Sequence, residues 1–381
     1  MRIGVLTSTR ADYGIYYSLL RALAADAATD FGLFVFGTHL SEGHGRTVSL
    51  IEADGHPIYE RVDSMPTNDD AAGIGRAMGK TTSNFAAVWE RWEDRLDVVI
   101  ALGDRYEMFA AVAATVPFGI CVAHLHGGET SLGAIDDKFR HALTQMSALH
   151  FTATPAYAEK VSHLTGRTHG VHYVGAPSLD GLTELPLLAV AEVRERFGMD
   201  FGQPTILVTF HPETVARAKN ETYGKELCAA LNKLTDRYQV VITMPNADTM
   251  GSVLRAQFLA LAAENNRVIT IESFGKIGYF SAMKHCAFLL GNTSSGIVEA
   301  ASFGKYAINL GDRQAGRAHS DNLITVPVDA GEIMTAIERV ESRGLSYEGK
   351  NAYVKDGSAA AEILFILKQE ITAKKTTGTV R

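Results

Sequence analysis

The chain has 381 residues, 46% of them hydrophobic, which is more than one core usually holds and predicts two domains. A formal net charge of −7 gives no basic stripe of the kind that neutralises a phosphate backbone, so nucleic acid is not an expected partner. Three scattered cysteines, no apolar run near 18 residues and a strand-like N-terminus favour a soluble cytoplasmic protein without membrane association.

Short apolar segments alternate with helical stretches in the first half of the chain, as in a parallel sheet covered by helices. The predicted strands are Ile3–Thr7, Phe31–Phe36, Val98–Leu102, Ile120–Ala123 and Leu149–Ala153. Apolar residues from Phe139 to Met146 recur at helical spacing, so Arg140, His141 and Gln145 are expected on the free face of that helix.

The alternation restarts after the turn-rich segment GAPSLD at 175–180, which predicts a second α/β domain. We place the domains at 1–181 and 182–358. The strands expected in the second are Thr205–Phe210, Val240–Met244, Val268–Ile271, Phe288–Leu290 and Ala307–Leu310. A helix is expected over 359–371, and the polar tail 372–381 lacks the apolar area that would offset its ordering entropy, so we expect it to be flexible.

Polar motifs follow the strands in both halves, which favours one ligand site between two domains, because parallel sheets bind ligands at the carboxyl ends of their strands. These motifs are Thr9–Tyr13, His39, Gly103–Glu107, His124–Asp137, His211, Asn246 and Gly291–Ser295.

The loop HLHGGETSLGAIDD at His124–Asp137 is dense in ionisable groups, which are costly to bury unless they are paired or functional, and this favours acid/base chemistry. An extended backbone would place His124 and His126 on the same side, a pattern also found in metal sites. No third ligand stands at a helical spacing, and we expect no metal. Asp136 also suits a helix N-cap, and Asp137 lies four residues before His141, so part of this charge is structural.

Two further strand ends carry candidate site residues. Asp104 with Arg105 is commonly a helix cap with a neighbouring ion pair, but a second carboxylate-rich loop shifts the interpretation toward catalysis. His211 precedes Pro212, and a lone histidine there is more often structural; the carboxylates expected opposite it favour a role in the site.

The segment GNTSSGIVEA at Gly291–Ala300 is the best phosphate candidate. Small and hydroxyl residues lead into a helix that Gly304 can close, so backbone N–H groups can meet an anion, and Glu299 can accept hydrogen bonds from a ribose. The alternative is an ordinary serine N-cap. Arg10 suits a diphosphate or carboxylate, whereas Asp12 suits helix capping. A Walker lysine and a GxGxxG after the first strand are both missing, which disfavours NTP hydrolysis and NAD chemistry.

Nine ordered blocks between about Arg2 and Asn322 resemble the hydrolysing UDP-N-acetylglucosamine 2-epimerases of bacterial sialic-acid-type pathways. The blocks are TSTRADYG, GTHL, GDRYE, HLHGGE, GAIDDKFRHA, VTFHPET, MPNADT, GNTSSGIVEAASFG and GDRQAGR. The resemblance implies two Rossmann-like domains with a cleft between them, as in GT-B glycosyltransferases, and a C-terminal helix that packs back on the N-terminal domain.

The motifs and the resemblance together give two sets of expected site residues. The catalytic set is Asp104, His126, Glu129, Asp136 and His211. The set that holds the UDP-sugar is Arg10, His39, Arg105, Asn246, Thr293, Ser294, Ser295, Gly296, Glu299 and Arg313. At His126 the HxHGGE form departs from the HIEGGE pattern of the animal branch and is similar to a bacterial branch, which leaves the role of this position open.

The implied reaction converts UDP-N-acetylglucosamine, or its 4-acetamido-6-deoxy relative UDP-N,N'-diacetylbacillosamine, to UDP and a free manno-configured sugar, in sialic or legionaminic acid synthesis. A carboxylate takes the C2 proton as UDP leaves C1, and water then adds to the glycal while a proton reaches C2 from the opposite face. No cofactor is required, and we expect a homo-oligomer, either a dimer or a tetramer. A non-hydrolysing epimerase, a GT-B glycosyltransferase and a non-catalytic nucleotide-sugar sensor are the alternatives.

Overall fold

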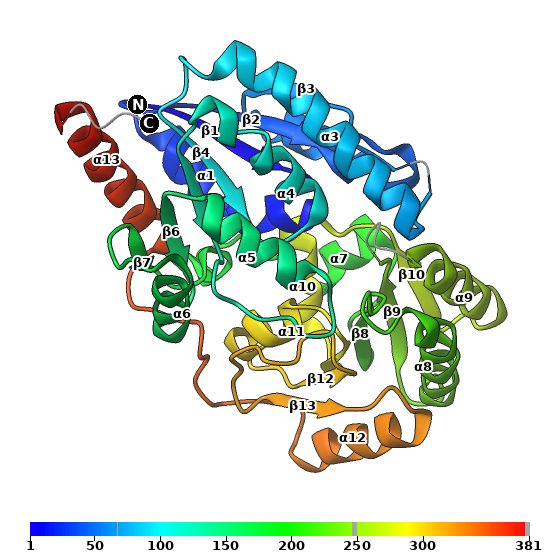
Figure 1. The fold of residues 1–381 in the computed structure, drawn as a ribbon. Coiled ribbons are helices and arrows are strands. Elements are labelled where there is room, and N and C mark those ends of the chain that lie inside the picture. Colours follow the sequence, from blue (N-terminus) through cyan, green and yellow to red (C-terminus); the bar gives the residue numbers. More distant parts are fainter. Residues whose placement is uncertain (67, 246–249, 378–381) are drawn as a thin grey trace. The chain divides into compact units, whose positions relative to one another are not determined.

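The computed structural model describes residues 1–66, 68–245 and 250–377, and the chain divides into two compact units (Figure 1). Unit 1 comprises Met1–Glu129, Asp136–Leu182 and Tyr353–Arg381, and unit 2 comprises Thr130–Ile135 and Thr183–Ala352. Two segments differ from the boundaries predicted from sequence. Residues 130–135 pack within unit 2, and the chain rejoins unit 1 at Tyr353 instead of near 358.

Unit 1 is built on a seven-stranded parallel sheet. Its strands are β1 (Arg2–Thr7), β2 (Asp30–Phe36), β3 (Ile58–Val62), β4 (Val98–Leu102), β5 (Val122–Leu125), β6 (Leu149–Thr152) and β7 (Val171–Tyr173). They lie in the order β3-β2-β1-β4-β5-β6-β7. The five predicted strands are present, whereas the sequence missed β3 and β7. Both are edge strands with partly exposed side chains, so neither has a continuous apolar run.

Helices cover both faces of this sheet (Figure 1). They are α1 (Arg10–Ala25), α2 (Val48–Ala53), α3 (Ala71–Trp92), α4 (Tyr106–Ala113), α5 (Asp136–Met146), α6 (Pro155–Thr165) and α13 (Ala359–Thr377), with short 3-10 turns at Gly37–Leu40, Glu42–His44, Val116–Phe118 and Pro177–Leu179. One core cluster joins Ile3 of β1 to Leu19 of α1 and Ile363 of α13. A second cluster, on Phe34 and Trp89, lies under α3 and α4.

Unit 2 is built on a six-stranded parallel sheet. Its strands are β8 (Thr205–Thr209), β9 (Gln239–Thr243), β10 (Val268–Ile271), β11 (Phe288–Gly291), β12 (Ala307–Leu310) and β13 (Leu323–Val326), in the order β10-β9-β8-β11-β12-β13. Its helices are α7 (Val190–Phe197), α8 (Asn220–Leu234), α9 (Gly251–Glu264), α10 (Gly275–His285), α11 (Ser295–Val298) and α12 (Ala330–Ser342), with 3-10 turns at Arg217–Lys219 and Ala300–Phe303. Two parallel α/β units confirm the predicted fold class, and the sequence missed only the half-exposed edge strand β13 here.

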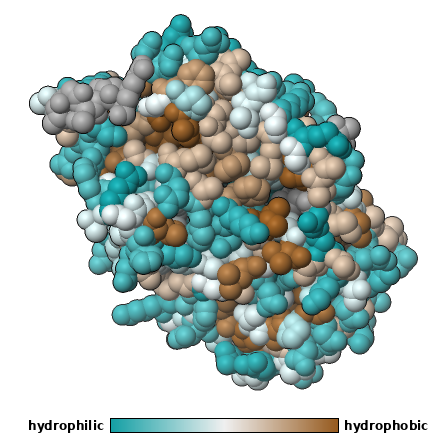
Figure 2. All heavy atoms as spheres, in the orientation of Figure 1, coloured by the Kyte–Doolittle hydropathy of each residue, from teal (hydrophilic) through white to brown (hydrophobic). Residues whose placement is uncertain are grey.

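The surface over α3 and α4 is weakly hydrophobic in Figure 2. The outer face of α3 carries exposed small residues, among them Gly75 and Gly79. A Cβ built on Gly79 would meet no atom within 4 Å. A small side chain there therefore changes no packing contact.

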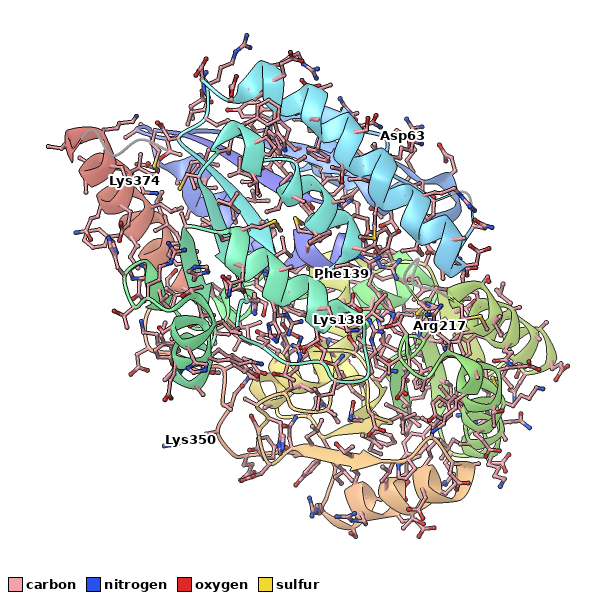
Figure 3. All side chains as sticks on the ribbon, viewed as in Figure 1. Asp63, Lys138, Phe139, Arg217, Lys350 and Lys374 are labelled. Carbon is pink, nitrogen blue, oxygen red and sulfur yellow. The ribbon has the colours of Figure 1, made fainter. Side chains whose placement is uncertain are left out.

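The last helix, α13, is longer than the sequence predicted, because it continues through 372–377 instead of ending at 371. Asp180 caps its start by accepting hydrogen bonds from the backbone N–H groups of Ala359 (2.8 Å) and Ala360 (2.7 Å). Near its end, Lys374, labelled on α13 in Figure 3, donates to the Cys121 sulfur. The next residue, Lys375, forms an ion pair with Asp97. Cations in the last turn of a helix also interact favourably with the negative end of the helix dipole. Residues 372–377, which were expected to belong to the flexible tail, are therefore ordered. Residues 378–381 of that tail lie outside the described residues.

No helix among residues 1–66, 68–245 and 250–377 has both the length and the apolar character needed to cross a lipid bilayer.

Candidate functional site

In both sheets the strand order reverses between two central neighbours, β1 and β4 in unit 1 and β8 and β11 in unit 2. Open parallel sheets bind ligands outside the carboxyl ends of their strands at such reversal points. The expected site residues that follow these four strands are Arg10, Asp104, Arg105, His211 and Thr293–Glu299. The topology of each unit therefore favours ligand binding at these residues.

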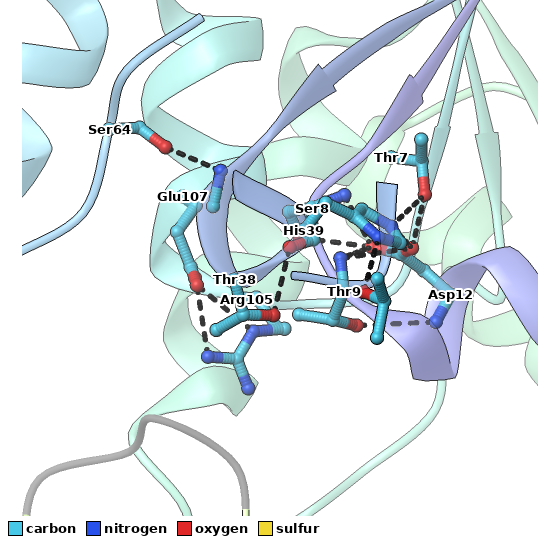
Figure 4. A network of polar contacts seen from close by, with 11 residues as sticks. Thr7, Ser8, Thr9, Asp12, Thr38, His39, Ser64, Arg105 and Glu107 are labelled. Atoms are coloured by element: carbon cyan, nitrogen blue, oxygen red, sulfur yellow. Dashed lines mark hydrogen bonds and ion pairs between the residues drawn. The ribbon is translucent and has the colours of Figure 1, made fainter. Parts of the chain in front are cut away.

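A buried polar network follows β1 (Figure 4). The Asp12 carboxylate accepts hydrogen bonds from the Thr7 hydroxyl (2.6 Å) and the backbone N–H groups of Ser8 (2.9 Å) and Thr9 (3.1 Å). Burial opposes ionisation of Asp12, but the nearby His39 ring, 3.8 Å away, and the hydrogen bond from Thr7 outweigh it and hold the pKa of Asp12 below its usual value. Thr9 and Asp12 form a capping box on α1, which confirms the predicted capping role of Asp12.

His39 belongs to this network, and its predicted contact with the ligand stays a prediction. Its side chain is fully buried, and its two ring nitrogens lie 2.9 Å from the Thr7 hydroxyl and 2.8 Å from the Thr47 hydroxyl. Both hydrogen-bonding positions are therefore used inside unit 1. Arg10, in contrast, opens α1 and is partly exposed, and its predicted contact with the ligand stays a prediction.

Two acid–arginine pairs follow β4. The Asp104 carboxylate accepts a hydrogen bond from Arg140 of α5, and Arg105 donates to Glu107 at 3.0 Å (Figure 4). Arg140 is 1% exposed and Glu107 is fully buried. The N-cap of α4 is Arg105, so Asp104 does not have the alternative role of a helix cap.

Arg140 corrects the sequence analysis, which placed it on the free face of its helix. The pattern of apolar residues identified the packed side of α5, but Arg140 is buried because Asp104 neutralises its charge. Arg140 is therefore a candidate site residue that the sequence analysis missed. Its expected neighbour His141 does lie on a half-buried face, 3.4 Å from Asp137 as the four-residue spacing predicted.

His124 lies within β5, since that strand spans 122–125 rather than the predicted 120–123. The shift arises because Gly119, with a φ of 65°, ends a 3-10 turn just before it. The His124 Nε2 lies 2.8 Å from the Gly103 carbonyl oxygen and its Nδ1 lies 3.2 Å from the Thr144 hydroxyl. Burial lowers the pKa of His124 to about 4, so it is a neutral structural residue at physiological pH.

His126 and Glu129 form a buried pair directly after β5. His126 has a φ of 63°, so the extended backbone stops before it and the expected alternation with His124 does not apply. Its Nδ1 lies 2.6 Å from the Glu129 carboxylate, and the two side chains are 9% and 1% exposed. The buried Nε2 has no hydrogen-bond partner among the described residues. A carboxylate on one nitrogen fixes the ring orientation and leaves the other nitrogen for proton transfer.

Asp136 is the first residue of α5 and is 9% exposed, so it lies in the first helical turn instead of at the predicted N-cap position. A carboxylate in that turn interacts favourably with the positive end of the helix dipole. Among the described residues, no three histidine, cysteine or carboxylate side chains are grouped so that they could hold a metal ion.

In unit 2, one asparagine links the segments that follow β8 and β11. The Asn292 side chain accepts from the His211 backbone N–H (2.7 Å) and donates to the His211 carbonyl oxygen (2.8 Å). Arg313 donates to the carbonyl oxygen of Pro212 (2.7 Å). The structure thus brings His211 and Arg313 together, both nearly buried. The sequence analysis missed Asn292, although its place between the strand and the TSS triplet was a usable signal.

Glu213 is a third residue that the sequence analysis missed. Its carboxylate accepts a hydrogen bond from the Asp312 backbone N–H (2.7 Å), and burial raises its pKa above the usual value. Asn220 bonds the backbone of Glu213 in both directions, at 2.9 and 3.0 Å. Glu213 therefore ties the segment after β8 to the segment after β12.

The predicted phosphate segment turns sharply at Gly291. Its φ is 136°, and a Cβ there would lie 1.9 Å from the Thr209 carbonyl oxygen. The helix that follows, α11, has four residues and continues as a 3-10 turn that Gly304 closes with a φ of 65°, so it is shorter than the single helix expected. The Ser294 side chain makes no capping hydrogen bond, which disfavours the ordinary serine N-cap. Thr293, Ser294 and Ser295 are partly exposed and Glu299 is nearly buried.

A cavity of about 10 Å³ beneath this segment, lined in part by Gly291, Gly296 and Asn309, has room for roughly one water molecule and is not a nucleotide pocket. Asn246, predicted to contact UDP, lies outside the described residues.

Comparisons with known proteins agree with this arrangement. The model of the family described as UDP-N-acetylglucosamine 2-epimerase matches residues 21–368. The chain belongs to the UDP-N-acetylglucosamine 2-epimerase family. The family assignment confirms the resemblance found in the nine sequence blocks.

Among curated relatives of this 2-epimerase, a UDP-N,N'-diacetylbacillosamine 2-epimerase (hydrolyzing) of Legionella pneumophila is 32% identical over 96% of this chain and 95% of its own. A GDP/UDP-N,N'-diacetylbacillosamine 2-epimerase (hydrolyzing) of Campylobacter jejuni is 29% identical over 90% of this chain and 88% of its own. The structure of UDP-GlcNAc 2-epimerase from Neisseria meningitidis bound to UDP-GlcNAc is 18% identical, with a TM-score of 0.78 over 97% of this chain and 100% of that one. At that identity the likeness shows the fold alone.

Proposed function

We propose that this 2-epimerase is a hydrolysing enzyme that converts UDP-N,N'-diacetylbacillosamine to UDP and the free manno-configured sugar. The observation that carries the proposal is the His126–Glu129 pair after β5, an oriented and buried imidazole whose Nε2 has no partner among the described residues. The Legionella and Campylobacter relatives support the hydrolytic outcome and this substrate. UDP-N-acetylglucosamine is the second substrate to test.

We propose that unit 2 holds the UDP portion. Arg313, the Ser294 hydroxyl and the N–H groups at the start of α11 would contact the diphosphate, and Glu299 would accept hydrogen bonds from the ribose. His211 would lie at the sugar, as the family resemblance implies. Negative charge grows on the diphosphate as the bond to C1 breaks, so contacts that strengthen with this charge accelerate the step.

The first step is an elimination. A base takes the C2 proton, the C2–H electron pair becomes the C1–C2 double bond, and UDP leaves C1 with the electrons of the C1–O bond. The product is a glycal. A general base in position typically contributes about 10² to 10⁴ in rate.

The second step restores the single bond with inverted configuration at C2. Water adds its hydroxyl to C1, and a proton reaches C2 from the face opposite to the one it left. The chemistry thus needs two proton-transfer groups, and we assign them to Asp104, held by Arg140, and His126, oriented by Glu129. Asp136 would bind the sugar beside them. Every step is redox-neutral, so no redox cofactor takes part.

We further propose that the enzyme takes part in nonulosonic acid synthesis, that it is cytoplasmic and that it forms a homo-oligomer. One experiment tests the reaction directly, namely NMR of the products formed from each UDP-sugar in deuterated water. We expect free UDP and a manno-configured sugar that carries deuterium at C2. A product that keeps UDP would instead identify a non-hydrolysing epimerase. Turnover only with an added acceptor would identify a glycosyltransferase, and UDP-sugar binding without turnover would identify a sensor.

A further inference from the structure

The chain leaves unit 1 within the loop that carries the proposed acid/base residues. Thr130–Ile135, here named the crossover loop, belongs to unit 2, whereas Glu129 before it and Asp136 after it belong to unit 1. Both ends of this six-residue segment are therefore covalently joined to proposed site residues of unit 1, while the segment itself clusters with unit 2.

Backbone hydrogen bonds fix the crossover loop on unit 2. The Ile135 backbone N–H donates to the Thr214 hydroxyl at 2.8 Å, and the Leu132 N–H donates to the Ala315 carbonyl oxygen at 3.1 Å. The Val215 N–H donates to the Gly133 carbonyl oxygen at 3.4 Å. Thr214 is the only one of these partners that acts through its side chain, so the Ile135 bond can be removed by substitution without altering the backbone.

Close backbone contact reinforces these bonds. A Cβ on Gly133 would lie 2.5 Å from both the Asp312 carbonyl oxygen and the Arg313 backbone nitrogen. Real Cβ contacts are essentially never that short, and the atoms met are backbone atoms that cannot rotate away. Gly133 therefore lets the crossover loop lie directly on the backbone of the proposed UDP-binding arginine.

The surface that receives the crossover loop is itself held in place. Glu213 accepts the Asp312 N–H, and Arg313 donates to the Pro212 carbonyl oxygen. Gln314 donates to the Asn292 carbonyl oxygen at 2.8 Å. The loop thus rests on segments that also carry His211 and Arg313 and that reach the start of the phosphate segment.

We propose that Thr214 and Gly133 are positioning residues for catalysis. They fix the crossover loop on unit 2, the proposed nucleotide-binding unit. Glu129 and Asp136 are bonded to the two ends of this loop, so the fixed loop limits where these two residues can lie. The inference rests on the proposed function. Misplacing a reacting group by about 1 Å can cost roughly 10²-fold in rate, so loosening the loop should lower kcat while leaving UDP contacts intact.

The test uses the full chain and the UDP-sugar that the wild type hydrolyses. Thr214→Val removes the acceptor for the Ile135 N–H while keeping the shape of the side chain, and we expect kcat to fall about tenfold or more. The Kd for UDP, measured by calorimetry, should stay within twofold. Thr214→Ser restores the hydroxyl and should restore most of kcat. Gly133→Ala should lower kcat further, by about 10².

Matched controls separate positioning from general damage. Thr335→Val removes a hydroxyl that bonds only its own helix, at the Gly331 carbonyl oxygen, and Gly79→Ala adds a methyl group where no atom lies within 4 Å. Both should keep kcat. If the wild type is active and Thr214→Val has the same kcat, the positioning role is wrong. It is also wrong if Thr214→Val loses UDP affinity and kcat in parallel and Thr214→Ser does not restore them. A wild type that releases no UDP would overturn the proposed function, and this inference with it.

Discussion

Arg140, which is 1% exposed, forms an ion pair with Asp104, 36 positions earlier in the chain, and this carboxylate supplies a counter-charge for the buried guanidinium. A buried cation that loses its partner destabilises a protein by about 3 to 5 kcal/mol, whereas an apolar replacement of both partners is often neutral. Asp104 is 22% exposed at its side chain, so one face of the pair is open to solvent or ligand. The pair therefore carries both a stability role and a proposed catalytic role, and substitutions can separate them.

Asp104→Asn should lower kcat by about 10² to 10⁴ while the Kd for UDP changes by no more than a few-fold, because the substitution removes a base and preserves shape. It should also lower the free energy of unfolding, since Arg140 then lacks its carboxylate. The double variant Asp104→Asn/Arg140→Met should recover the stability but not the activity. Urea denaturation and steady-state kinetics measure the two effects. Near-normal turnover in Asp104→Asn would show that Asp104 only neutralises Arg140.

His126→Asn should lower kcat by about 10² or more, because the imidazole is the proposed second proton-transfer group. Glu129→Gln should lower kcat less, since it weakens the orientation of His126 but keeps the imidazole. Prolonged chelation should leave wild-type activity unchanged. A raised KM at constant kcat in His126→Asn would show that His126 only contacts the sugar. Loss of wild-type activity on chelation that zinc reverses would favour a metal site instead.

Ser294→Ala combined with Glu299→Ala tests where UDP binds. If these residues contact the diphosphate and the ribose, UDP binding should weaken by roughly 2 to 4 kcal/mol, because hydrogen bonds to charged groups contribute about 1.5 to 3 kcal/mol each. Isothermal titration calorimetry measures the change, with Thr335→Val as the control in the same unit. Equal affinities for UDP in the double variant and the control would show that UDP does not bind at this segment.

The buried strands could be predicted from sequence because continuous runs of apolar residues leave few other structures possible. The edge strands β3 and β7 could not, since their sequences IYERV and VHY contain no such run. Their positions at strand ends make Asp104 and His211 site candidates, but position alone cannot separate a ligand contact from a structural bond. His39 shows this limit, because Thr7 and Thr47 occupy both of its nitrogens.

Partners that are distant in sequence account for the other differences. Helical periodicity assigns a charged residue to the exposed face, so the burial of Arg140 depends on knowing that Asp104 lies beside it. The crossover loop has no signature in its own residues, because its placement on unit 2 depends on the Asp312–Arg313 backbone and the Thr214 hydroxyl. Such pairings require the folded structure.

Two buried histidines on adjacent strands should make unit 1 sensitive to acid. His124 of β5 pairs in register with His150 of β6, and burial lowers their pKa values to about 4 and about 3. An unfolded histidine titrates near pH 6.5, so between about pH 6.5 and pH 4 the unfolded state binds more protons than the folded state. The contribution of these neutral histidines to the free energy of unfolding is therefore fully present above about pH 6.5. It decreases as the pH falls toward 4, by roughly 3 kcal/mol for His124 alone.

His150→Phe tests this linkage, because neither ring nitrogen of His150 has a hydrogen-bond partner among the described residues. The substitution removes a buried polar ring that must stay neutral and replaces it with an apolar ring of similar size. We expect urea midpoints at pH 5 and pH 7.5 to differ less in the variant than in the wild type, with little loss of stability at pH 7.5. His163→Phe, on α6, is the control, because the His163 side chain is exposed on the surface of the same unit. Equal pH dependence in the His150 variant and the wild type would contradict the assignment.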